Sequence, residues 1–140
     1  MNTETENLRA GERFTSQLYL LDAAAAEAYG KSIEEPPRRR RKNIHTDNAA
    51  ATQAGFAAPI AAGEQTIAVA AQLLVDRFGM RFLRGGRIEV ALVKPVFYGD
   101  SLVASAEVER AGAERIELKL SVANQRGEQV LTGTAQARAR

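Results

Sequence analysis

The sequence predicts an α+β protein in which an antiparallel sheet of five or six strands wraps around one long central helix. Two observations carry this expectation: a long apolar segment in the middle of the chain, and four runs of alternating apolar and polar residues after it. Alternation with a period of two buries one face of a sheet, and a helix that is apolar on most of its circumference must be covered. We therefore expect the helix and the sheet to cover each other.

The central helix is expected over Glu64 to Phe78 (EQTIAVAAQLLVDRF), shortly after Pro59. Its apolar positions recur at helical spacing on one face: Ile67, Ala71 and Leu74, with Ala70 and Leu73 beside them. This spacing is typical of a helix that packs against other elements.

Four strands are expected after the helix, over Arg87–Val93, Ser101–Arg110, Arg115–Asn124 and Gln129–Ala137. Turn signals separate them at residues 98–100, 111–113 and 125–127. Because short connections join antiparallel neighbours, we expect the four strands to follow one another as a meander.

The N-terminal part is expected to contain a flexible tail over residues 1–10 and a first strand over residues 13–21 (RFTSQLYLL). Asp22 is a favourable N-cap for a short alanine-rich helix that reaches about Tyr29, with Gly30 ending it. The next segment (GKSIEEPPRRRRKN) has two prolines and a charge run, so it indicates an exposed loop.

A second short helix is expected over residues 48–54 (NAAATQA), just before the central helix. Either Thr46 or Asp47 can cap it, and Gly55 closes it.

Composition limits the class of protein. The 140 residues predict a single domain over 1–140, and the absence of cysteine excludes disulfides and thiolate metal sites. The chain has no apolar run near the ~20 residues that span a bilayer, and its polar start lacks the apolar core of a signal peptide. We therefore expect a cytoplasmic protein that has no membrane contact.

The net charge is only +2, but residues 38–42 (RRRRK) concentrate the positive charge. Such a run is usually a solvated loop. No aromatic residues are interleaved with it, so nucleic acid is not expected as a partner.

A long helix covered by a curved antiparallel sheet, with one strand before it and four behind, is a hotdog fold. One such sheet leaves an open edge strand and a partly uncovered helix. Pairing of edges in a two-fold homodimer, or in a higher homo-oligomer, removes both liabilities.

Four segments give the chain a family resemblance from about Phe14 onward: NIHTD with its following alanines, GFAAPIAAGEQT, GGRIEVALVKPVFYGDSL and VANQRGEQVLTGTAQA. In this order and spacing the sequence resembles the MaoC-like, (R)-specific enoyl-CoA hydratases, which are single-hotdog proteins. The resemblance implies hydration or dehydration of an enoyl or 3-hydroxyacyl thioester. The thioester is carried by coenzyme A or a carrier protein, as part of the substrate, and neither a metal nor a further cofactor is implied.

By motif position, the resemblance implies that His45 is the catalytic histidine and that the amide of Gly63 binds the thioester oxygen. Both roles agree with physical chemistry. Neutral imidazole is the natural base near physiological pH, and a helix N-terminus offers free amides for an oxyanion. Judged without the motif, His45 would more often be a hydrogen-bonded structural residue.

The family has an aspartate five residues before this histidine, where the present sequence has Arg40. Glu64, next to Gly63, is our candidate for a second catalytic group, although a glutamate in the first turn of a helix is also favoured by the helix dipole alone. Glu34 and Glu35 could fold back from the loop. Asp47 is better explained as a helix cap.

Five further residues are candidate substrate contacts: Asn43, Arg40, Arg41, Phe56 and Ile60. The two arginines could meet the phosphates of the thioester carrier. Asn43 could orient the substrate or hold the loop turn, and core packing explains Phe56 equally well. Two other functions remain open: an acyl-thioester hydrolase in which Glu64 activates water, and a non-catalytic acyl-thioester-binding protein that lacks the aspartate.

Overall fold

A computed structural model of the protein describes residues 7–32 and 43–140. Residues 1–6 of the tail predicted over 1–10 lie outside the described residues, as does most of the predicted loop, including Glu34, Glu35, Arg40 and Arg41. Within the tail, Leu8 packs against the hydrophobic core, so this part of the predicted tail belongs to the fold.

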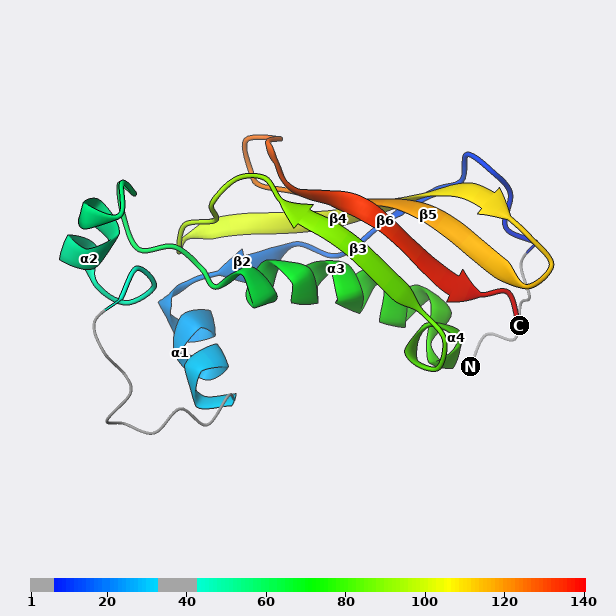
Figure 1. Ribbon diagram of the computed structural model, residues 1–140, viewed down its shortest axis with the longest axis horizontal. Coiled ribbons are helices and arrows are strands. Elements are labelled where there is room, and N and C mark those ends of the chain that lie inside the picture. Colours follow the sequence, from blue (N-terminus) through cyan, green and yellow to red (C-terminus); the bar gives the residue numbers. More distant parts are fainter. Residues whose placement is uncertain (1–6, 33–42) are drawn as a thin grey trace.

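Six strands form an antiparallel sheet in the order β1-β4-β5-β6-β3, with β2 also paired to β4 (Figure 1). Their bounds are β1 Arg13–Thr15, β2 Tyr19–Leu21, β3 Arg87–Leu92, β4 Asp100–Ala111, β5 Arg115–Ala123 and β6 Gln129–Arg138. This confirms the hotdog fold and, within one residue at each end, the four predicted strands after the helix.

The single strand predicted over residues 13–21 is in fact two short strands. Thr15 pairs with Ser105, whereas Tyr19 pairs with Leu102, so the register against β4 shifts by one residue between them. Ser16 lies in the gap, where its Oγ accepts a hydrogen bond from the Ala104 amide at 2.9 Å. A side chain that bonds to the backbone competes with the regular ladder, which explains the interruption.

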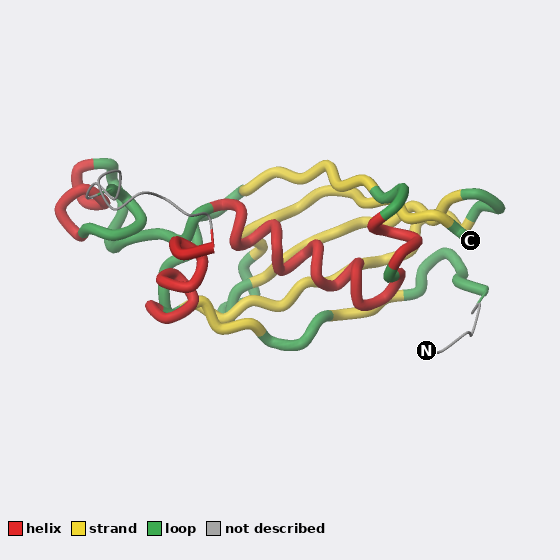
Figure 2. The backbone as a smooth tube through the Cα atoms, turned by 90° about the horizontal axis from the view of Figure 1, so that it is seen from below, coloured by secondary structure: helices red, strands yellow, loops and turns green. Residues whose placement is uncertain are grey.

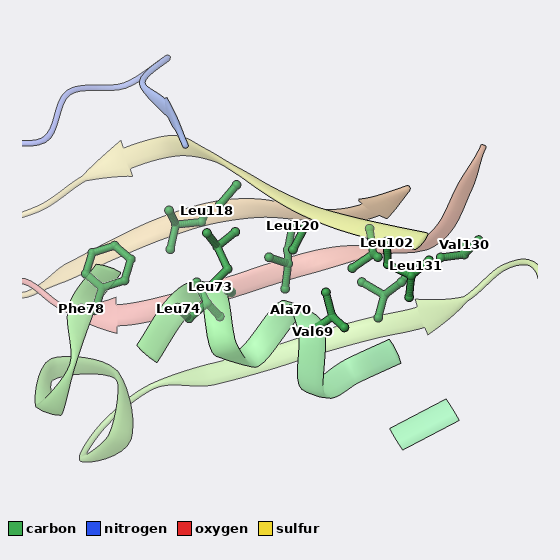
Figure 3. Packing of buried hydrophobic residues seen from close by; sticks show 14 of the residues in the cluster. Val69, Ala70, Leu73, Leu74, Phe78, Leu102, Leu118, Leu120, Val130 and Leu131 are labelled. Atoms are coloured by element: carbon green, nitrogen blue, oxygen red, sulfur yellow. The ribbon is translucent and has the colours of Figure 1, made fainter. Parts of the chain in front are cut away.

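The long helix α3 (Gly63–Phe78) crosses one face of the sheet (Figure 2). Its buried apolar side chains pack against leucines and valines of β4, β5 and β6 (Figure 3): Val69, Ala70, Leu73, Leu74 and Phe78. The buried face of α3 is rotated slightly from the predicted apolar stripe: Ile67 and Ala71, which were predicted to lie on it, are only partly buried. One chain therefore covers one side of α3, and the opposite side is exposed along its length.

The predicted meander is correct for β4, β5 and β6 but wrong for β3. β3 pairs with β6 at the far edge of the sheet, so residues 93–99 cross from one edge toward the other. The crossing covers three inter-strand steps of about 4.8 Å, roughly 14 Å in all. Seven residues can span up to ~23 Å, so a short connection did not require adjacent strands.

Three further helices lie outside the core layer: α1 (Ala23–Ser32), α2 (Asn48–Gln53) and α4 (Met80–Leu83). As predicted, Asp22 Oδ1 caps α1 by accepting from the Ala25 amide at 2.9 Å. Contrary to the prediction, Gly30 does not end α1. It lacks the positive φ that makes glycine a helix terminator, and the helix continues to Ser32.

The cap of α2 is Asp47 rather than Thr46, since Asp47 Oδ2 accepts from the Ala50 amide at 2.9 Å. Gly55 follows α2 with φ 89°, a conformation that favours glycine. Helix α4 was not predicted. In residues 7–32 and 43–140, no helix has both the length and the apolar character that a bilayer crossing needs.

Candidate active site

A groove of about 290 Å³ lies where α3 begins, between the chain that enters the helix and the chain that leaves β3. Its lining residues are His45, Phe56, Ile60, Ala61, Gly63, Thr66, Leu92, Val93, Lys94, Pro95 and Val96. Four residues predicted from the sequence therefore meet in one place: His45, Phe56, Ile60 and Gly63. Most of the other lining side chains are apolar.

The ring of His45 is held by the backbone. Its Nδ1 lies 2.8 Å from the carbonyl oxygen of Ile60, which can only accept a hydrogen bond. Nδ1 therefore carries the proton of the neutral ring, and Nε2 is the nitrogen with the free electron pair. The Ile60 amide in turn donates to the Ile44 carbonyl at 3.0 Å, so the two segments are fastened beside each other.

Asn43 shapes the turn that presents the histidine. Its Oδ1 accepts from the backbone amide of His45 at 2.9 Å, two residues further on. This local bond is typical of an asparagine that stabilises a turn. Asn43 does not line the groove, so the structure favours the turn-holding role among the two roles considered.

Gly63 is the first residue of α3 and contributes to the groove through its backbone. The first amides of a helix have no partner inside the helix, and no side chain of the N-cap residue Ala62 bonds to them. The helix dipole makes this end favourable for negative charge. A methyl group on Gly63 would overlap Cδ1 of Leu92, so glycine keeps a narrow space open between the helix end and β3.

Glu64 is placed differently from its neighbour. It is exposed and is absent from the groove lining. Its role as a second catalytic group stays a prediction, as do those of Arg40 and Arg41.

Several groove residues were not predicted as part of a site. Thr66 is 2% exposed and follows Gly63 by three residues, which places both on one face of α3. The sequence signal for it was a threonine three residues after the motif glycine. Residues 92–96 line the opposite wall, and they reach it only because β3 lies at the sheet edge.

Lys94 is fixed in this wall by an ion-pair network. Its Nζ donates to Glu128 Oε2 at 2.6 Å, and Arg126 Nε donates to Glu128 Oε1 at 2.6 Å. The hydrogen bonds from Lys94, Arg126 and Asn124 lower the pKa of the Glu128 carboxyl from 4.5 to about 2. The network thus joins the groove wall to the β5–β6 turn.

We expect Glu128→Gln to lower the melting temperature at neutral pH, and this deficit to shrink in acid. The folded-state pKa of Glu128 lies below its ordinary value, so its stabilising effect is fully present above pH 4.5 and is lost as the pH falls through about 2. Thermal unfolding of both proteins across this range measures the difference. The matched control is Glu64→Gln, which removes an exposed carboxylate outside the network. A Glu128→Gln deficit that stays constant down to pH 2 would contradict the assignment.

Among the described residues, no group of three or more histidine, aspartate or glutamate side chains is arranged to hold a metal ion. The polar groups that line the groove are the imidazole of His45, the helix-end amide of Gly63, the hydroxyl of Thr66 and the ammonium group of Lys94.

The comparisons with known proteins agree with this architecture. The model of the MaoC-like domain family matches residues 41–129, more than half of the chain, and includes the histidine, the groove and most of the sheet. The chain therefore belongs to the MaoC-like domain family. No curated protein matches the sequence significantly.

The solved structures that are similar over nearly the whole chain include the following three. A MaoC-like dehydratase from Rhodospirillum rubrum is 28% identical, with a TM-score of 0.71 over 95% of this chain and 93% of its own. An (R)-hydratase from A. caviae involved in PHA biosynthesis is 24% identical, with a TM-score of 0.71 over 94% and 96%. The ChsH1–ChsH2 complex from Mycobacterium tuberculosis contains a chain that is 17% identical, with a TM-score of 0.73 over 94% and 98%. The last two similarities concern the fold alone.

Proposed function

We propose that the protein hydrates an enoyl thioester, or dehydrates a 3-hydroxyacyl thioester in reverse, in the groove at the start of α3. The observation that carries the proposal is the bond from His45 Nδ1 to the Ile60 carbonyl, in the same groove as the free helix-end amide of Gly63. The bond gives the ring one basic nitrogen, and the amide supplies a site for an oxyanion.

Hydration needs one water molecule and two proton transfers, one to His45 and one back from it. His45 Nε2 takes a proton from water, and the hydroxide adds to C3 of the enoyl group. The electron pair of the double bond moves into the thioester, whose oxygen gains negative charge and accepts a hydrogen bond from Gly63. The imidazolium then returns the proton to C2, so that the elements of water are added and the ring is regenerated.

The groove walls suit an acyl group. Phe56, Ile60 and Leu92 line it with apolar side chains. Thr66 contributes a hydroxyl group and Lys94 an ammonium group. A mostly apolar groove with few polar groups is typical of small-molecule sites. We propose Arg40 and Arg41 as contacts for the phosphates of the thioester carrier.

A second candidate is a non-catalytic protein that binds acyl thioesters. It is favoured by one observation: among the described residues that line the groove, none carries a carboxylate. The third candidate, a thioester hydrolase, needs Glu64 to activate water, and this side chain lies outside the groove lining.

One set of assays separates the three candidates. Loss of the enoyl absorbance of crotonyl-CoA without thiol release supports hydration. Thiol release from an acyl-CoA, followed with a chromogenic thiol reagent, would show that the protein is a thioester hydrolase and not a hydratase. If crotonyl-CoA binds but neither its enoyl absorbance falls nor thiol is released, the protein is a non-catalytic acyl-thioester-binding protein.

We also propose that the protein works as a homodimer joined at β3. This strand pairs only with β6 among the described strands, so its outer edge is open. Leu92 and Val93, at its end, are 51% and 50% exposed in the single chain. An open edge with apolar side chains is a liability that a second copy removes.

Sedimentation at low micromolar concentration tests the dimer, and we expect a single species of twice the chain mass. A folded protein that sediments as a ~15 kDa monomer, with native circular dichroism, would rule out obligate dimerisation.

A further inference from the structure

Four arginines surround one hollow at the end of the sheet far from the His45 groove. The hollow has a volume of about 460 Å³ and is lined by Arg84, Arg115, Arg138 and Arg140, together with Gly85, Ala113 and Glu114. It lies where α4, the start of β5 and the end of β6 meet, near the C-terminus in Figure 1. Within one chain, the length of α3, about 24 Å for its 16 residues, separates the two sites.

The sheet register forces two of these charges together. Arg115 and Arg138 are direct partners across β5 and β6, so their side chains leave the same face of the sheet. Like charges directly opposite each other destabilise a sheet. The alkyl stem of Arg138 also lies against Gly85: a methyl group there would come within 2.7 Å of Arg138 Cδ. The missing side chain at Gly85 thus gives Arg138 room at the hollow.

These guanidinium groups lack the partners that neighbouring cations have. On the same sheet, Arg110 pairs with Glu117 and Arg87 with Glu89, both at 2.8 Å. Among the described residues, none of the four arginines of the hollow forms an ion pair. Arg115 donates to the neutral amide oxygen of Gln136 at 3.0 Å, and Glu114 is the only acidic side chain in the lining.

We propose that this hollow binds a phosphate-bearing anion of two or more negative charges, at a site separate from the His45 groove. A planar guanidinium donates two parallel hydrogen bonds to phosphate oxygens, and several such groups match a multiply charged anion better than a single carboxylate. The volume is within the range of small-molecule sites, so it admits an organic phosphate larger than the inorganic ion. Such an anion would offset the repulsion that the register imposes on Arg115 and Arg138.

Calorimetric titration of the full chain with pyrophosphate, at an ionic strength held constant with chloride, tests the site. We expect saturable binding that Arg115→Gln combined with Arg138→Gln weakens by about tenfold or more, the effect of losing charge-assisted hydrogen bonds worth at least one factor of ten. The matched control is Arg87→Gln combined with Arg110→Gln, which removes the same charge from arginines that already have carboxylate partners. We expect less than about a twofold change there, because neither guanidinium lines the hollow and the charge of an ion-paired surface arginine is screened by salt.

If both double substitutions weaken pyrophosphate binding equally, the binding comes from general surface charge and the proposal is wrong. Absence of saturable binding would also overturn it. Melting temperatures without pyrophosphate control for folding. The Arg115→Gln, Arg138→Gln protein should melt at the same temperature as the wild type or about 1–3 °C higher, since a like-charge pair is removed. A lower melting temperature would contradict the repulsion on which the argument rests.

Competition with coenzyme A identifies the source of the phosphate. Displacement of pyrophosphate by coenzyme A, abolished in the Arg115→Gln, Arg138→Gln protein, would assign the hollow to the carrier arm of a thioester. Pyrophosphate binding without competition would assign it to a free organic phosphate. His45→Ala should leave pyrophosphate binding unchanged, so the anion site and the proposed hydratase activity stand or fall separately.

Discussion

Replacing His45 by alanine is expected to lower enoyl-thioester turnover by roughly 10²–10⁴-fold, the range for loss of a general base. The substitution removes the basic Nε2 and also the bond from Nδ1 to the Ile60 carbonyl. Steady-state hydration of crotonyl-CoA measures the loss.

A matched variant separates chemistry from folding. In His45→Asn the side-chain amide nitrogen can take the place of Nδ1 and donate to Ile60, but no base remains. We expect His45→Asn to keep the wild-type melting temperature and to be as inactive as His45→Ala. An active wild type that tolerates both substitutions would remove His45 from the reaction.

Glu64→Gln tests the one carboxylate beside the motif glycine. Because Glu64 is exposed and lies outside the groove lining, we expect turnover and melting temperature close to those of the wild type. A loss as large as that of His45→Ala, with unchanged stability, would instead make Glu64 the replacement for the missing aspartate.

Gly63→Ala is expected to lower kcat/KM by about 10²-fold, the effect of an ångström-scale misplacement of a reacting group. The added methyl would overlap Leu92 Cδ1, and the displaced side chain would enter the space beside the helix-end amide. The glycine has no positive φ, so alanine can adopt its backbone conformation, and the fold should persist.

The partner substitution Leu92→Ala removes the overlap. We expect it to restore most of the activity when combined with Gly63→Ala, measured against Leu92→Ala alone, which also loses one apolar wall of the groove. If Gly63→Ala is inactive and Leu92→Ala gives no recovery, the loss would come from the helix end itself. Full activity of Gly63→Ala would contradict the tight approach of β3 to this amide.

Much of the fold could be predicted because the local periodicity of apolar residues indicates where helices and strands lie. The apolar repeat placed the start of α3 one residue from its observed position, and alternation gave β4, β5 and β6 to within a residue at each end. The position of β3 could not be predicted in this way. A seven-residue connection can lead to the adjacent strand or pass two intervening strands, and local sequence does not distinguish the two paths.

The candidate site also has a part that local sequence predicts and a part that depends on the sheet order. His45 and Gly63 were identified by motif position, and both line the groove. Residues 92–96 were missed as site residues because their place in the groove depends on the position of β3. The exposure of Glu64 did have a local signal: Glu64, Ala68, Gln72 and Asp76 recur at four-residue spacing, and all four lie on the exposed face of α3.

The most direct test of the proposed site is a crystal structure of the protein with an unreactive enoyl-thioester analogue. We expect the thioester oxygen at about 2.7–3.1 Å from the Gly63 amide nitrogen, and His45 Nε2 within reach of a water molecule beside C3. An analogue bound with its thioester away from the start of α3, or with Gly63 and His45 both out of contact, would contradict the assignment of this groove as the active site.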